Sequence, residues 1–94
     1  MDKENKQAFS KLEKIVKGFS NHWRIEILML LDREPELSVV EIVEMLNMNY
    51  KTASEHIRRM ALAGLIAKRY DNANVRHKLT SRGEAILKFL RILE

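Results

Sequence analysis

Apolar residues recur every three or four positions in five segments of this chain of 94 residues. Such spacing is typical of helices that bury one face and expose the other. The first segment predicts a helix over residues 3–17, which Gly18 ends. The second predicts a helix that Ser20 or Asn21 could cap and that stops shortly before Pro35, because proline disfavours helical backbone at the residue before it.

Polar side chains mark the start of the next two helices. Ser38 and Glu41 have the spacing of a capping box and open a short third helix. Asn49 can cap a fourth helix that ends at Gly64. Asn47 lies in the turn between these two helices, where asparagine tolerates left-handed backbone better than most residues do.

Two short segments with branched and aromatic residues follow the fourth helix, at 65–70 and 75–80. Residues 71–74 between them have the composition of a turn, so the pattern predicts a β-hairpin. The turn contains no glycine, and we expect Asn72 or Asn74 to supply any unusual backbone angle.

The predicted order is helix, helix, helix–turn–helix, hairpin and helix. The fold class is therefore mainly α with a small β-hairpin (α+β). Two helices joined by a short turn, with a hairpin behind the second, describe a winged helix-turn-helix of five helices and a two-stranded wing. The length suits one domain over residues 1–94.

Charge is distributed unevenly along the chain. Residues 1–47 contain seven Lys/Arg and nine Asp/Glu, a balance of −2, whereas residues 48–94 contain ten and four, a balance of +6. The basic half suggests a polyanionic partner. A merely solvated basic face explains the charge bias equally well, so charge alone does not decide.

The fourth helix divides into two faces at about 100° per residue. Ala53, Ile57 and Met60 share the predicted core face. The opposite face and the wing provide cations and hydroxyls for phosphates and base edges, and Glu55 could accept a hydrogen bond from cytosine. We expect these cations to form a single surface that fits a duplex. The candidate DNA-binding residues are Asn49, Tyr50, Lys51, Thr52, Ser54, Glu55, Arg58, Arg69, Arg76 and Lys78.

The segment "ELSVVEIVEMLNMNYKTASEHIRRMALAGLI" resembles the helix-turn-helix of ArsR-like winged-helix transcription regulators. The resemblance covers roughly residues 18–83. It implies base reading by Tyr50, Lys51, Ser54 and Glu55, with support from Thr52, His56 and Arg76. The chain departs from the family pattern at Asn47, which replaces a turn glycine, and at Glu55, where the family often has histidine.

Several classes of function are not expected. Cysteine is absent, and the three histidines lie on separate predicted elements, whereas metal-sensing members of the resembled family use cysteines or His/Asp clusters. We therefore expect no metal and no cofactor. No nucleophile–base set and no glycine-rich phosphate loop is present, so an enzyme is not expected. Without a long apolar segment or a signal peptide, we expect no membrane contact and a cytoplasmic location.

The two terminal helices carry more apolar residues than one packed face needs. The last helix begins at Thr80 or Ser81, with Ser81 and Glu84 as a further possible capping box, and runs to about residue 93. These helices could close the core of the same chain, but we predict that they also pack across a twofold axis in a homodimer. The predicted interface comprises Phe9, Leu12, Val16, Ile86, Phe89, Leu90 and Leu93.

A dimer would place two recognition helices about 34 Å apart, or a multiple of this, on a pseudo-palindromic site. The sequence thus predicts a sequence-specific regulator of transcription that binds double-stranded DNA, most simply as a repressor because the chain has little room for another domain. The alternative is a winged-helix module that binds an acidic protein with the same basic face. RNA is a weaker candidate because the A-form major groove excludes helices.

Overall fold

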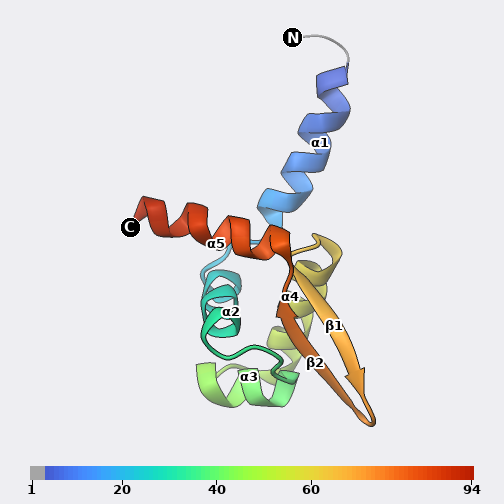
Figure 1. Ribbon diagram of the computed structural model, residues 1–94, viewed down its shortest axis with the longest axis vertical. Coiled ribbons are helices and arrows are strands. Elements are labelled where there is room, and N and C mark those ends of the chain that lie inside the picture. The colour runs from blue at the N-terminus through green and yellow to red at the C-terminus, as the bar shows by residue number, and fades with distance from the viewer. Residues whose placement is uncertain (1–3) are drawn as a thin grey trace.

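The computed structural model describes residues 4–94 and contains five helices and one hairpin within that range (Figure 1). The predicted helix start at Lys3 lies outside the described residues. The elements in chain order are α1 (Glu4–Lys17), α2 (His22–Arg33), α3 (Val39–Leu46), α4 (Tyr50–Leu62), β1 (Ile66–Asp71), β2 (Asn74–Leu79) and α5 (Ser81–Leu93). The predicted order of elements and the winged helix-turn-helix architecture are confirmed.

The helix starts follow from local side-chain chemistry. Asn21, rather than Ser20, caps α2 by accepting a hydrogen bond from the Trp23 amide at 2.8 Å. Ser38 and Glu41 form the predicted capping box at the start of α3. These contacts fix where α2 and α3 begin, and so where the helix-turn-helix lies in the chain.

The start of α5 differs from one prediction. Thr80 is the N-cap, and its hydroxyl accepts a hydrogen bond from the Gly83 amide at 3.0 Å. The predicted capping box of Ser81 with Glu84 is therefore wrong. Thr80 also donates a hydrogen bond of 2.6 Å to the carbonyl oxygen of Gly64, so tertiary contact decides between the two neighbouring hydroxyls.

The wing is an antiparallel pair with a two-residue turn. Asp71 pairs with Asn74 at the end of the ladder, which leaves Asn72 and Ala73 to close the hairpin. Asn72 takes left-handed backbone with φ 54°, which settles the choice between the two predicted asparagines. Leu37 forms an isolated antiparallel bridge with His77, so the loop before α3 lies along the outer edge of β2.

One core joins α2, α3, α4, the wing base and α5. Its fully buried side chains include Ile27, Leu28, Ile42, Ile57 and Met60, and the predicted core face of α4 is confirmed. Gly83 allows α5 to pack closely, because a Cβ there would lie 2.1 Å from the carbonyl oxygen of Leu65.

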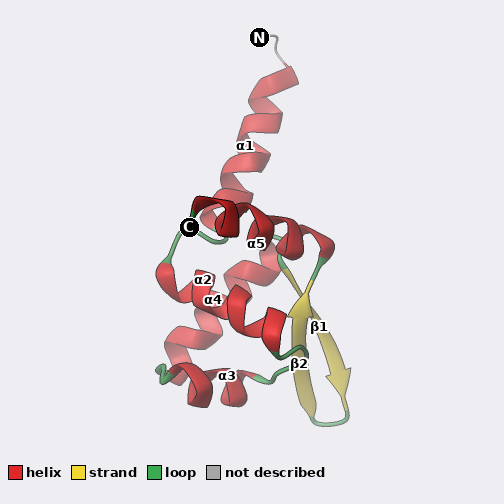
Figure 2. Ribbon diagram, turned by 60° about the vertical axis from the view of Figure 1, so that its left-hand side comes forward, coloured by secondary structure: helices red, strands yellow, loops and turns green. Residues whose placement is uncertain are grey.

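α1 projects away from the other elements, and α5 lies across the body beneath it (Figures 1 and 2). Of the residues predicted for the dimer interface, Ile86 and Leu90 pack partly against the core. The other five are about half exposed or more: Phe9, Leu12, Val16, Phe89 and Leu93. Among the described residues, no helix has the length and apolar character needed to cross a membrane.

Candidate nucleic-acid interface

Two asparagines fix the short turn between α3 and α4. Asn47 ends α3 in left-handed backbone with φ 54°, as predicted. Asn49 caps α4 by accepting a hydrogen bond from the Thr52 amide at 3.1 Å. The side-chain oxygen of Asn49 is occupied by this bond, so the main role of Asn49 is to fix the start of α4.

The candidate residues of α4 share its outer face. Tyr50 is 56% exposed. The other exposed candidates on this helix are Lys51, Thr52, Glu55 and Arg58. Ser54 is half-buried, at the edge of this face. The first turn contains no acidic residue, and the positive end of the helix dipole therefore faces outward there without a neutralising carboxylate.

A groove of about 720 Å³ runs between α4 and the wing. Its α4 side includes Tyr50, Ser54 and Arg58, and its wing side includes Lys68 and Tyr70. We call this feature the groove. It brings three of the predicted DNA-binding residues into one concave surface with a wing cation, and that surface opens beside the N-terminal half of α4.

Lys68 and Tyr70 were absent from the predicted binding residues. In the observed register Lys68 lies opposite His77 and Tyr70 opposite Val75, and all four line the groove. The alternation of side chains along a strand could have predicted this placement from the sequence. Lys68 and Tyr70 share a face with buried Ile66 and must therefore point toward α4.

The predicted wing cations lie on the other face of the hairpin. Arg69 and Arg76 are register partners, and Lys78 shares their side of the ladder. The expectation that all cations from Lys51 to Lys78 form a single surface is therefore wrong. Successive side chains of a strand point to opposite faces, so a hairpin with Lys68 and Arg69 in sequence must separate them.

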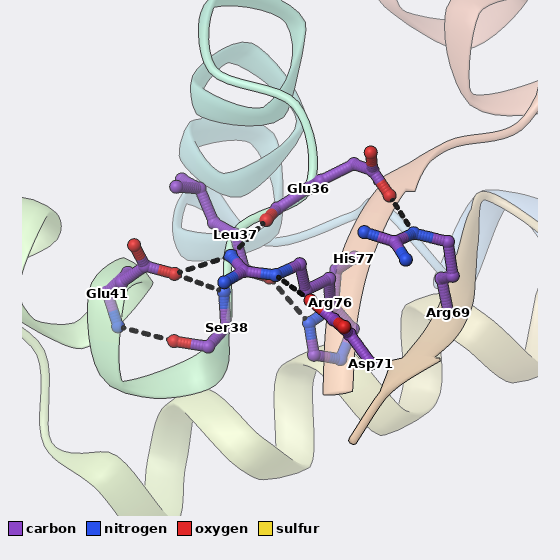
Figure 3. Close-up of polar contacts among 8 residues, drawn as sticks. All are labelled: Glu36, Leu37, Ser38, Glu41, Arg69, Asp71, Arg76 and His77. Atoms are coloured by element: carbon purple, nitrogen blue, oxygen red, sulfur yellow. Dashed lines mark hydrogen bonds and ion pairs between the residues drawn. The ribbon is translucent and has the colours of Figure 1, made fainter. Parts of the chain in front are cut away.

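The two wing arginines bind acidic groups of the chain itself (Figure 3). Arg69 donates a hydrogen bond to Glu36, which lowers the pKa of that carboxyl group. Arg76 donates to the Glu36 carbonyl oxygen at 3.0 Å and lies 3.4 Å from both Asp71 and Glu41. These bonds connect the wing to the loop before α3 and partly neutralise both arginines.

His77 completes that connection from the buried side. It is 2% exposed, and its Nδ1 lies 2.9 Å from the Leu37 carbonyl oxygen. Because a carbonyl only accepts, Nδ1 donates, and the ring can remain neutral. Burial lowers the pKa of His77 below its ordinary value of 6.5, so the wing base is held by a neutral imidazole near pH 7.

Glu55 neutralises two cations of α4. Its carboxylate accepts hydrogen bonds from Arg58 at 2.8 and 3.1 Å and from Arg59 at 2.9 Å. These bonds, with Arg58 as the larger cause, lower the pKa of Glu55 to about 2. Lys51, Lys68 and Lys78, by contrast, are exposed and make no ion pair within residues 4–94.

A model of the family described as bacterial regulatory protein, arsR family, matches residues 22–68, half of the chain. The chain belongs to the ArsR family. The match begins with α2 and ends within β1, so it contains the whole of α3 and α4 and reaches Lys68. No curated protein is significantly similar to this ArsR-family chain in sequence.

Solved structures share the ArsR-family fold over nearly the whole chain. Reduced HlyU from Vibrio cholerae is 29% identical with a TM-score of 0.80, over 98% of this chain and 97% of that one. A homodimeric winged helix-turn-helix DNA-binding domain from Mycobacterium bovis, a possible ArsR-family regulator, is 19% identical with a TM-score of 0.87, over 99% and 86%. The transcriptional repressor PagR of Bacillus anthracis is 19% identical with a TM-score of 0.78, over 89% and 97%.

Metal ligands do not gather anywhere in the part of this ArsR-family chain that the structure describes. No group of three or more His, Cys, Asp or Glu side chains over residues 4–94 could hold an ion. His22 instead pairs with Glu26 at 2.9 Å, and His56 accepts a hydrogen bond from Arg24 at 3.0 Å.

Proposed function

We propose that this ArsR-family protein binds a pseudo-palindromic site in double-stranded DNA as a homodimer and represses transcription there. The observation that carries the proposal is the groove, in which Tyr50, Ser54 and Arg58 of α4 face Lys68 and Tyr70 of the wing. A helix with an exposed polar N-terminal face enters a major groove, and a cation across the groove meets the adjacent phosphates.

Each side chain on α4 has a chemical role in this proposal. Lys51 and Arg58 bind phosphates or guanine acceptors, Ser54 bonds to a base edge, and Tyr50 contacts a thymine methyl group. Glu55 accepts from a cytosine amino group and at the same time restrains Arg58. Thr52 is exposed in the first turn of α4, where its hydroxyl can bind a phosphate oxygen.

The wing contributes in two ways. Lys68 is the unpaired wing cation on the groove side and the first candidate for a phosphate contact. Lys78 is exposed on the other face, and Arg69 and Arg76 must exchange their carboxylate partners for DNA before they can contribute. The Arg69 pair is exposed and the Arg76 pairs are partly exposed, and ion pairs in contact with water are weak, so phosphate can compete for these arginines.

The homodimer is supported by the apolar surface that α1 and α5 leave uncovered. Phe9, Leu12 and Val16 on α1 and Phe89 and Leu93 on α5 are exposed although each is apolar. Exposed apolar side chains grouped on a helix in this way are typical of an interface with another molecule. The similar domain from Mycobacterium bovis is a homodimer.

Repression requires only that the bound dimer occupies DNA that polymerase must enter. The similar protein from Bacillus anthracis is a transcriptional repressor, which agrees with this simplest mechanism.

An electrophoretic shift with random duplex DNA at about 50 mM salt tests the DNA contact, because nonspecific affinity is strongest at low salt. We expect a shift that Arg58→Ala and Arg76→Ala each weaken modestly, because Glu55 competes for Arg58, and Glu41 and Asp71 compete for Arg76. Arg33→Ala is the matched control, since Arg33 is exposed at the end of α2 and away from the groove. If wild-type protein leaves the DNA unshifted, the result contradicts the DNA contact and favours the alternative, an acidic protein partner on the same face.

A further inference from the structure

A second cavity, of about 250 Å³, lies where the end of α1 and the start of α2 meet the C-terminal end of α4. Four of its lining residues are cations: Lys14, Lys17, Arg24 and Arg59. The others are apolar or glycine: Gly18, Leu62 and Ala63. We call this cavity the cationic pocket. It shares no lining residue with the groove, and α4 meets it at the end opposite to Asn49.

We propose that the cationic pocket binds a small organic anion, a carboxylate or phosphate ester with a short apolar part. The four cations attract the negative group, although Lys17 pairs with Glu13 at 3.7 Å and Arg59 with Glu55 at 2.9 Å outside the lining. Lys14 and Arg24 make no ion pair within residues 4–94. The apolar lining residues contact the apolar part of the ligand, and the volume of the cavity limits the size of the ligand.

The backbone at Gly18 holds the pocket in shape. A Cβ on Gly18 would lie 2.4 Å from the Cβ of Ala63 and 3.0 Å from the Ile15 carbonyl oxygen. Only glycine therefore permits the end of α1 to press against the end of α4. This close approach brings Lys14 and Lys17 to the same cavity as Arg59.

Two hydrogen bonds hold the side chain of Arg24 in the cationic pocket. It donates to the Lys17 carbonyl oxygen at 2.5 Å and to Nδ1 of His56 at 3.0 Å. Burial, and then the positive charge of Arg59, lower the pKa of Arg24. The two guanidinium groups repel each other. The nearby Glu55 carboxylate, which pairs with Arg59, opposes this repulsion only in part, and a bound anion would relieve it further.

The pocket stays accessible in the proposed dimer. At about 100° per residue, Lys14 lies on the side of α1 opposite to Phe9, Leu12 and Val16, and Lys17 lies at the flank of that apolar stripe. The apolar stripe can therefore pack against a partner while the cations continue to face α2 and α4.

An anion bound in the cationic pocket would change the ion pairs of the proposed DNA-binding surface. Arg59 shares the Glu55 carboxylate with Arg58, and an anion that attracts Arg59 leaves Glu55 to Arg58 alone. This consequence rests on the proposed function, whereas ligand binding itself can be measured without DNA. A protein that binds the anion but no DNA would contradict only the proposed function.

The direct test is an amide and arginine Nε NMR titration of the full chain with sodium benzoate, with inorganic phosphate and with uncharged benzyl alcohol. We expect benzoate to shift the signals of Gly18, Ala63 and Arg59. We expect the Lys14→Gln/Arg59→Gln double variant to weaken benzoate binding about tenfold or more, because charge-assisted hydrogen bonds are lost. The control is Arg33→Gln/Lys88→Gln, which makes the same charge change at exposed positions outside the pocket.

Four results would overturn the proposal. They are the absence of shifts with benzoate, shifts confined to other parts of the chain, equal weakening in both double variants, and binding of benzyl alcohol as tight as that of benzoate. Binding of inorganic phosphate at the pocket without benzoate is a case of the first result, and it would show that the site takes a bare anion and not an apolar part. Circular dichroism checks that each double variant keeps the helical content of the wild type.

Discussion

Glu55→Gln is the most informative single change, because it removes the one carboxylate that restrains two arginines of α4. Arg58 and Arg59 each donate to this group, and all three side chains are about half exposed. The glutamine has nearly the same shape but no charge. We therefore expect Arg58 to become available to phosphate and nonspecific DNA affinity to rise.

The size of the effect follows from counterion release. The logarithm of the binding constant falls with the logarithm of salt concentration with a slope of about −0.9 per neutralised phosphate. Four phosphates per protomer give a slope on the order of −7 for a dimer. One further contact per protomer steepens the slope of the dimer by about 1.8, so the affinity advantage of the variant over the wild type shrinks about 12-fold as salt rises fourfold.

Fluorescence anisotropy with a labelled random duplex, at salt concentrations from about 50 to 200 mM, measures both slopes. Glu84→Gln makes the same charge change on exposed α5 and should leave the slope unaltered. Because the pKa of Glu55 is about 2, the carboxylate is ionised at every pH from 5 to 8, and the difference between variant and wild type should not depend on pH there. Parallel salt plots for Glu55→Gln and the wild type would refute the reasoning.

Three further changes test the core, a helix cap and the dimer. Ile57→Asp should unfold the domain in thermal melts, because it buries an unpaired charge at a cost of about 4 kcal/mol or more, while Leu62→Asp on the exposed side of the same helix should leave it folded. Thr80→Ala should cost about 1–2 kcal/mol in urea titrations and Ser81→Ala almost nothing; equal costs would contradict the observed cap. Phe89→Glu should change the mass in light scattering from twice 11.1 kDa to 11.1 kDa with the fold retained, and an unchanged dimer would remove α5 from the interface.

The parts of the fold that local chemistry decides could be predicted from the sequence. The capping box at Ser38 and Glu41 and the left-handed Asn47 each depend on residues within one turn of the chain. Periodicity identified Ile57 and Met60 as core residues because an amphipathic helix must bury its apolar stripe. Family resemblance added the name of the family but not the geometry of the wing.

The parts that tertiary contact decides could not be predicted. Glu36 adopts φ 69° in the loop before α3, and nothing in its neighbours' sequence indicates that its side chain meets Arg69, 33 residues away. The same holds for the contact of Arg76 with the Glu36 carbonyl oxygen. Lys68 is a different case, because strand alternation from Ile66 was sufficient to assign it to the groove.

The central claim is that the N-terminal half of α4 and the groove side of the wing receive duplex DNA. Amide NMR of the ¹⁵N-labelled chain with a duplex from a selected random pool measures this directly, since each amide reports its own contact. We predict shifts concentrated in residues 49–58 and 68–74, with little change in the exposed end of α5. Shifts concentrated in α1 and α5, or shifts no larger than those that an acidic peptide produces, would contradict the account.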